Sequence, residues 1–145
     1  MPGRTWFRSA WFPVACWLLV ILGLSSIPDL GTREQKVPWS DKLAHGCEYG
    51  VLGVLFARAV TAKRPQTRRA VVRVVAVAAL IGLSIGSLDE WYQTLIPGRS
   101  SGPGDAAADM IGAALGGAAW ASGTLHRVSR NVAHRMGRSM GRRTS

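Results

Sequence analysis

The chain has 145 residues, which is enough for one domain. Its net charge of +10 would suit a nucleic-acid-binding protein, but 48% of the residues are apolar and they fall in long runs. A soluble domain of this size could not bury that much apolar surface, whereas a lipid bilayer can solvate it. We therefore predict an all-α, polytopic membrane protein that does not bind nucleic acid.

Four apolar runs predict four transmembrane helices in a small bundle. A helix needs about 17–25 residues to cross about 30 Å of hydrocarbon, and the two middle runs reach this length only with flanking polar residues at the interfaces. The first run could instead be a cleaved signal peptide, because Arg4 and Arg8 precede it and small residues follow. Its length and its tryptophans favour a retained helix. The four runs cover residues 11–27, 43–57, 74–88 and 106–125.

The basic residues orient this bundle. All but four of the 18 Lys and Arg residues lie in the segments 1–10, 58–73 and 126–145, so the positive-inside rule places both termini in the cytoplasm. We expect these segments to contact anionic lipid headgroups. The chain then divides into a cytoplasmic N-terminus (1–10), a four-helix membrane domain (11–125) and a basic cytoplasmic tail (126–145). We expect this tail to be disordered or to lie on the membrane surface.

Ionisable side chains interrupt the second span on one side. Asp41, His45 and Glu48 are spaced i, i+4 and i+7, which places them on one helix face, and Tyr49 continues that face. Ionisable groups inside a span cost about 2.5–3.5 kcal/mol each at the helix centre, so they are usually paired and functional.

The third and fourth spans carry polar groups at the corresponding depth. Asp89 and Gln93 are four residues apart at the outer end of the third span, with Glu90 one residue round, and Asp105 and Asp109 share a face of the fourth. We expect the three helices to bring these groups together on the outer side. Glycine pairs four residues apart predict that the same three helices pack closely, with the first helix at the periphery. The pairs are Gly46 and Gly50, Gly82 and Gly86, and Gly112 and Gly116.

The second outer loop holds a single positive charge, Arg99. It lies among carboxylates, so a structural ion pair is its default interpretation, and binding of a phosphate or carboxylate is the alternative. Asp105 follows a Gly-rich segment and precedes an apolar run, which predicts that it caps the N-terminus of the fourth helix.

At these residues the sequence resembles the VanZ-like family of bacterial membrane proteins. Residues 41–49 read D-K-x-x-H-x-x-x-Y, and residues 89–93 read D-E-x-x-Q. Residues 97–100 read P-G-R-S, and residues 105–116 read D-x-x-x-D-x-x-G-x-x-x-G. The resemblance covers roughly residues 12–120 and implies a multi-pass protein of the bacterial cytoplasmic membrane. It also implies a role in the cell envelope, since the family is named for a member linked to teicoplanin resistance.

Three functions remain open. The first is a non-enzymatic protein that binds or shields an anionic, lipid-linked component such as a cell-wall precursor, and so alters susceptibility to the glycopeptide teicoplanin. The second is an intramembrane enzyme that uses acid–base or metal chemistry. Its catalytic candidates are His45, Glu48, Asp89 and Glu90. The third is a membrane scaffold whose polar cluster only fixes helix packing.

The sequence assigns no cofactor and no metal site, because a single His without a second supports a zinc site weakly. For the metal-dependent alternative, the donors considered are His45, Glu48, Asp89 and Asp109. The expected partners are the bilayer and the lipid-linked precursor or glycopeptide, and homo-oligomerisation stays open. The candidate ligand-binding residues are Lys42, His45, Tyr49, Asp89, Gln93, Arg99, Asp105 and Asp109.

Overall fold

The computed structural model describes residues 2–28, 39–61 and 67–141, with side chains described for 9–28, 39–61 and 67–124. Roles expected for side chains in the first outer loop and the basic tail lie outside these ranges. Within them the chain is all-helical and has four helices and no strand. The helices are α1 (Pro2–Ser25), α2 (Ser40–Thr61), α3 (Arg68–Gln93) and α4 (Pro103–Gly141).

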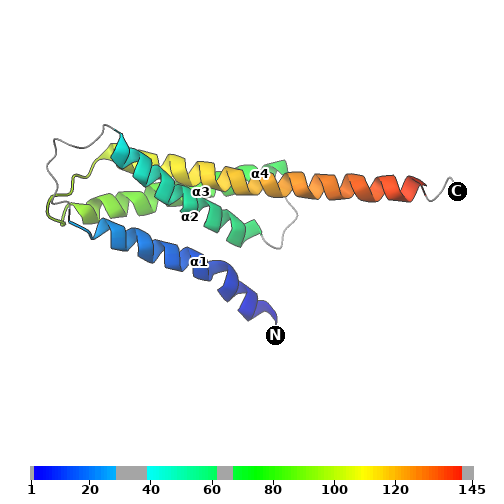
Figure 1. The fold of residues 1–145 in the computed structure, drawn as a ribbon, viewed down its shortest axis with the longest axis horizontal. Coiled ribbons are helices and arrows are strands. Elements are labelled where there is room, and N and C mark those ends of the chain that lie inside the picture. Colours follow the sequence, from blue (N-terminus) through cyan, green and yellow to red (C-terminus); the bar gives the residue numbers. More distant parts are fainter. Residues whose placement is uncertain (1, 29–38, 62–66, 142–145) are drawn as a thin grey trace.

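The helices run alternately up and down, so that the C-termini of α1 and α3 meet the N-termini of α2 and α4 at one end of the bundle (Figure 1). We call this the loop end. Local sequence sets the limits of α3. The Thr67 side chain caps its start by accepting a hydrogen bond from the Ala70 amide at 3.2 Å. Its end is followed by a turn in which Gly98 adopts φ 79°, a left-handed conformation that glycine adopts without steric cost.

Helix α4 is the centre of the bundle and packs most extensively against α2 and α3. A Cβ atom on Gly112 or Gly116 would overlap the carbonyl oxygens of Gly46 and Gly50 on α2, so the two backbones are in direct contact. On the other side of α4, Gly82 and Gly86 of α3 pack against residues 109–113. The predicted compact unit of the last three helices is therefore confirmed.

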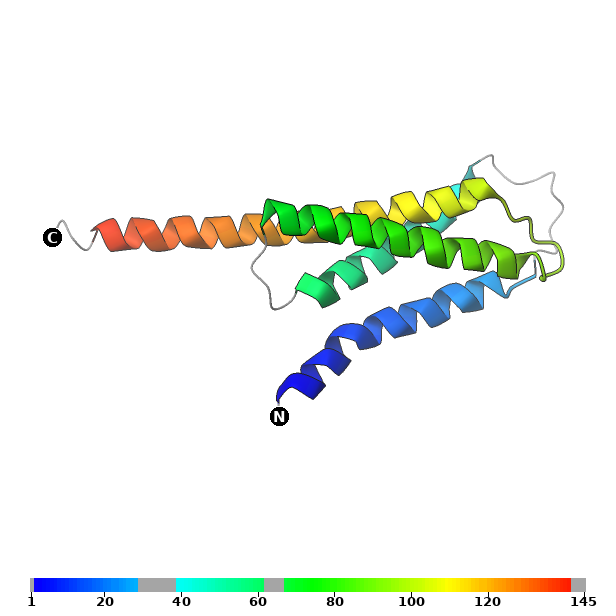
Figure 2. The ribbon, with the colours of Figure 1, turned by 180° about the vertical axis from the view of Figure 1, so that it is seen from behind.

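Helix α1 lies at the periphery and diverges from the other helices toward its N-terminus (Figure 2). The structure gives it contacts with α2 and α3. The indole of Trp17 donates a hydrogen bond to the Glu48 carbonyl oxygen of α2 at 2.8 Å. At the C-terminal end of α1, the Ser25 hydroxyl donates a hydrogen bond to the Asp89 carboxylate of α3. The attachment of α1 therefore depends on a few polar contacts as well as apolar packing.

By length and apolar composition, α3 is the one helix in the described ranges that could cross a membrane. The apolar part of α1, Ser9–Ser25, is shorter. The charged face of α2 and the many small residues of α4 lower their hydropathy. The prediction of four spans is therefore not confirmed by this criterion.

One local prediction for α4 is wrong. The helix begins at Pro103, so Asp105 lies in the first turn and does not cap it. Proline suits the first helical position because it needs no amide hydrogen there. The helix also continues to Gly141, so most of the segment for which we expected disorder or a position on the membrane surface is helical. No proline follows Pro103 in the sequence, so nothing breaks the helix after the apolar run ends.

Candidate functional site

His45 lies between two carboxylates at the loop end, one from α3 and one from α4. Its Nδ1 is 3.0 Å from Asp109 Oδ1 and its Nε2 is 3.7 Å from Glu90 Oε1. The first distance is a hydrogen bond and the second is too long for one. All three side chains are buried, Asp109 completely. We refer to His45, Glu90 and Asp109 as the buried triad.

Close backbone packing holds the triad in place. Asp109 Oδ2 lies against Gly86, one turn before Glu90 on α3, where any larger residue would displace the carboxylate. Glu90 is fixed from the opposite side, because its Oε2 accepts a hydrogen bond of 2.6 Å from the Gly102 amide in the loop before α4. The other oxygen of each carboxylate, Glu90 Oε1 and Asp109 Oδ2, is buried without a hydrogen-bond partner in the described part of the chain.

Asp89 belongs to a different network, although it is the neighbour of Glu90. Its Oδ2 accepts hydrogen bonds from Ser25 Oγ at 2.7 Å and Gln93 Nε2 at 2.8 Å. Successive residues on a helix point about 100° apart, so Glu90 faces α2 and α4 while Asp89 faces α1. Asp89 and Glu90 were both catalytic candidates from the sequence, and of the two it is Glu90 that lies near His45 in the structure. The network of Ser25, Asp89 and Gln93 ties α1 to α3.

Lys42 and Asp105 form an ion pair beside the triad, with Nζ and Oδ1 2.6 Å apart. The hydrogen bond to Asp105 raises the pKa of Lys42 above its usual value of 10.5. The ammonium of Lys42, a candidate for binding the anionic ligand, is therefore already paired with a carboxylate. The sequence could not reveal the pair, because the two residues lie 63 positions apart.

Arg99 forms no ion pair with a residue in the described ranges, contrary to its default interpretation. Its Nη2 donates a hydrogen bond of 3.3 Å to the carbonyl oxygen of Leu24, at the end of α1. Its Nε is buried and lacks a partner among the described residues. Two residues after Leu24, the hydroxyl of Ser26 is hydrogen-bonded to the hydroxyl of Tyr92 at 2.9 Å. Arg99 thus adds a positive charge, with hydrogen-bonding capacity to spare, to the end of α1.

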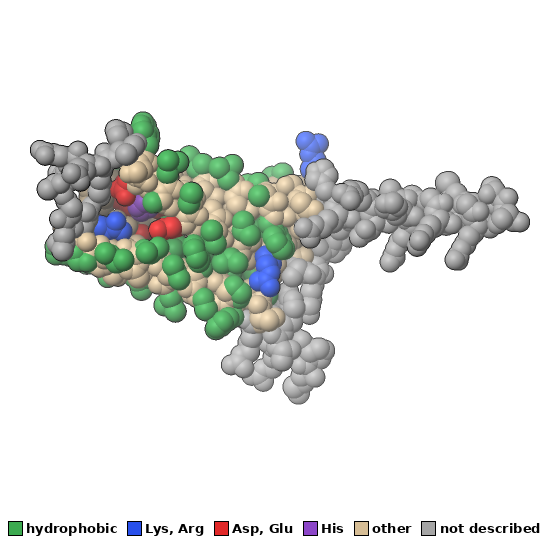
Figure 3. All heavy atoms as spheres, in the orientation of Figure 1, with side chains coloured by type: hydrophobic (Ala, Val, Ile, Leu, Met, Phe, Trp, Pro, Cys, Tyr) green, Lys and Arg blue, Asp and Glu red, His purple; other side chains and the backbone are tan. Residues whose placement is uncertain are grey.

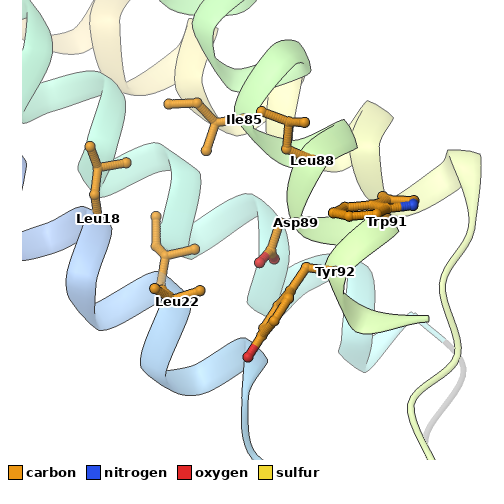
Figure 4. Close-up of a pocket in the computed structure, with 8 residues that line it drawn as sticks. Leu18, Leu22, Ile85, Leu88, Asp89, Trp91 and Tyr92 are labelled. Carbon is orange, nitrogen blue, oxygen red and sulfur yellow. The ribbon is translucent and has the colours of Figure 1, made fainter. Parts of the chain in front are cut away.

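A crevice of about 310 Å³ runs between α1 and α3 next to this end (Figure 4). Its walls are almost entirely apolar, and Asp89 is the one carboxylate in them. The volume is at the lower limit of ligand pockets, about 300 Å³. It suits one narrow apolar group. The lining residues are Leu18, Ile21, Leu22, Ile85, Leu88, Asp89, Trp91 and Tyr92.

The remaining predicted site residues fall outside the triad. Tyr49 is completely buried, with a hydroxyl that has no partner within the described chain, and is part of the apolar core. Glu48 is half-buried on α2, and no hydrogen bond of its carboxylate is seen in the described region. Ser25 was assigned no role from the sequence, although a serine at the end of an apolar run is a candidate for a buried hydrogen bond.

The predicted convergence of three helices is nevertheless confirmed, since α2, α3 and α4 each contribute one member of the triad. Figure 3 shows acidic, basic and His side chains gathered at the loop end, whereas the middle of the described surface in this view carries hydrophobic side chains and basic groups reappear at the opposite end. In comparisons with protein-family models, curated proteins and solved structures, no significant match to this chain was found.

Proposed function

We propose that this chain is a multi-pass, VanZ-like protein of the bacterial cytoplasmic membrane that binds an anionic, lipid-linked component of the cell envelope. By binding or shielding this component, it modulates susceptibility to teicoplanin. In this proposal all four helices cross the membrane, both termini are cytoplasmic, and the loop end faces outward.

Exposed apolar side chains on three helices support a membrane location. Phe12 and Leu19 of α1, Leu80 and Leu88 of α3, and Leu115 of α4 are each 63–69% exposed. Only 17% of the most apolar window of α3 is buried within the protein. Water would solvate such surfaces poorly, and hydrocarbon solvates them well. Lipid around α1, α3 and α4 would cover these exposed side chains.

The observation that carries ligand binding is that Arg99 is held at the C-terminal end of α1, the helix that forms one wall of the apolar crevice. Its guanidinium is held at the end of α1, two residues beyond the crevice wall at Leu22, and its Nε has no partner in the described chain. A ligand with a negative headgroup and a hydrocarbon chain matches both features, because Arg binds phosphate or carboxylate while the crevice takes the chain. Lys42, already paired with Asp105, is not needed for this interaction.

The test compares Arg99→Lys with wild type in nanodiscs that contain a polyprenyl-phosphate-linked cell-wall precursor. Lys keeps the charge but loses the planar fork of donors. We therefore expect the variant to bind about tenfold less precursor than wild type, measured by native mass spectrometry. Arg73→Lys, the same substitution at the opposite end of α3, is the matched control. In a deletion host, teicoplanin susceptibility should follow precursor binding when folded protein is equal. Equal precursor binding by Arg99→Lys and wild type would refute the role of Arg99.

A further inference from the structure

The buried triad holds two carboxylates, and a protonated His45 would neutralise only one of them. It brings together two carboxylates and one imidazole, while the nearest ammonium, that of Lys42, is already paired with Asp105. Burial of an uncompensated carboxylate is costly, and burial of two within reach of one another costs more. A positively charged occupant would neutralise the second carboxylate, which has no cation partner among the described side chains.

Two carboxylate oxygens of the triad have no hydrogen-bond partner in the described chain. Glu90 has a side chain that is 9% exposed, and its Oε1, 3.7 Å from His45 Nε2, lacks a hydrogen bond from the described chain. Asp109 is 0% exposed, and its Oδ2 is equally unpartnered. One ligand atom from each of the three residues lies within 4.8 Å of the other two. Two ligands of a tetrahedral zinc ion, each at about 2.0–2.2 Å, are about 3.4 Å apart.

We propose that His45, Glu90 and Asp109 bind a divalent transition-metal ion of the zinc type. One nitrogen and two carboxylate oxygens suit such an ion, whereas Mg²⁺ and Ca²⁺ prefer oxygen ligands alone. The two negative charges balance the charge of the ion, so the assembled site is neutral at a buried position. The hydrogen bond from Gly102 to the second oxygen of Glu90 fixes one ligand, as outer contacts commonly do in metal sites. Ligand atoms that lie up to 4.8 Å apart in the structure would approach one another to about 3.4 Å when the ion binds.

This set of ligands differs from the donors considered from the sequence. Glu90 replaces Asp89, whose oxygen already accepts two hydrogen bonds, and Glu48 is not part of the cluster. The structure thus supplies three converging ligands from three helices. The inference does not depend on the proposed lipid ligand, because metal content can be measured without that ligand.

The experiment measures metal binding by the full-length chain in nanodiscs. The protein is stripped with a chelator, titrated with Zn²⁺, and assayed for bound metal by mass spectrometry and for thermal stability. We expect each chain to bind one ion, and this binding to require the triad residues. The melting temperature should rise with Zn²⁺ concentration. Glu90→Gln should weaken this binding about 10–100-fold or more. Mg²⁺ and Ca²⁺ at the same concentrations should not reproduce the effect.

Controls separate the triad from other donors. Glu48→Gln removes a half-buried carboxylate one turn from His45 and should bind zinc like wild type. Replacing His126 and His134 by Gln removes the other two histidines of the sequence and should also leave the site intact. Asp109→Asn removes a different metal-binding carboxylate and provides a second test if Glu90→Gln folds poorly. Zinc binding that survives both Glu90→Gln and Asp109→Asn in folded protein, or no triad-dependent zinc in wild type, would overturn the proposal.

Discussion

Replacement of Gly112 by alanine tests whether backbone contact between α2 and α4 holds the buried triad together. A Cβ atom at this position would overlap the carbonyl oxygen of Gly46 and lie 2.9 Å from its Cα and carbonyl carbon. Carbon atoms in ordinary contact are about 3.5–4.0 Å apart, so the helices must separate by roughly 0.6–1.1 Å. The neighbouring His45–Asp109 hydrogen bond, 3.0 Å in the structure, would then exceed the usual range of about 2.7–3.2 Å.

The expected loss of stability follows from three contributions. Overpacking of a close interface costs about 1–3 kcal/mol. A broken interhelical hydrogen bond in a membrane bundle costs about 0.6–1.7 kcal/mol. Alanine is the better helix former by about 0.5–1 kcal/mol, which offsets part of the loss. We therefore expect the free energy of unfolding to fall by about 1–4 kcal/mol.

Unfolding in mixed micelles, followed by circular dichroism, measures this change. The control is Gly23→Ala in α1, where a Cβ atom would meet nothing within 4 Å. This variant should be neutral or more stable by up to about 1 kcal/mol. If Gly112→Ala proves as stable as Gly23→Ala, the backbone contact between α2 and α4 is not tight and our account of the triad's geometry fails.

Three other substitutions test the polar contacts around the bundle. Ser25→Ala removes the hydroxyl that donates to buried Asp89 and should lower the free energy of unfolding by about 1–3 kcal/mol, measured in the same micelles. Trp17→Phe loses one hydrogen bond to the α2 backbone and should lower the free energy of unfolding by about 0.5–1.5 kcal/mol. We expect this loss to be smaller than that of Ser25→Ala, and an equal or larger loss would contradict the expectation. Lys42→Met removes the ion pair with Asp105. Because the folded state raises the pKa of Lys42 above 10.5, its contribution is complete below that pH and is lost as pH rises through the raised value. Stability profiles of wild type and Lys42→Met should therefore converge at high pH, and a constant gap would exclude this linkage.

The pattern of small and apolar residues was sufficient to predict the packing of the bundle. Spacing within a helix predicts which residues share a face, and glycine pairs predict which faces can approach closely. Both arguments use local sequence alone. They correctly predicted four helices, the close packing of the last three and the gathering of polar groups at one end.

The sequence could not predict which polar groups pair with one another. Asp89 and Glu90 are adjacent and chemically alike, and only the rotation of α3 relative to its neighbours decides which of them meets His45. That rotation follows from the contact of Gly86 with Asp109, which involves residues 23 positions apart. Arg99 was equally ambiguous, since the choice between a carboxylate and the Leu24 carbonyl depends on how α1 docks.

The length of α4 has a consequence on the opposite side of the proposed membrane. At about 1.5 Å per residue, its 39 residues extend about 58 Å, whereas the hydrocarbon core is about 30 Å thick. The backbone of α4 projects well beyond the other helices (Figure 1). In the proposed topology it forms a spacer with a cytoplasmic reach of tens of ångströms. Arg127 and Arg130 then stay within about 8 Å of the end of the proposed span at residue 125, whereas Arg135 and Arg138 are carried about 15–20 Å beyond it.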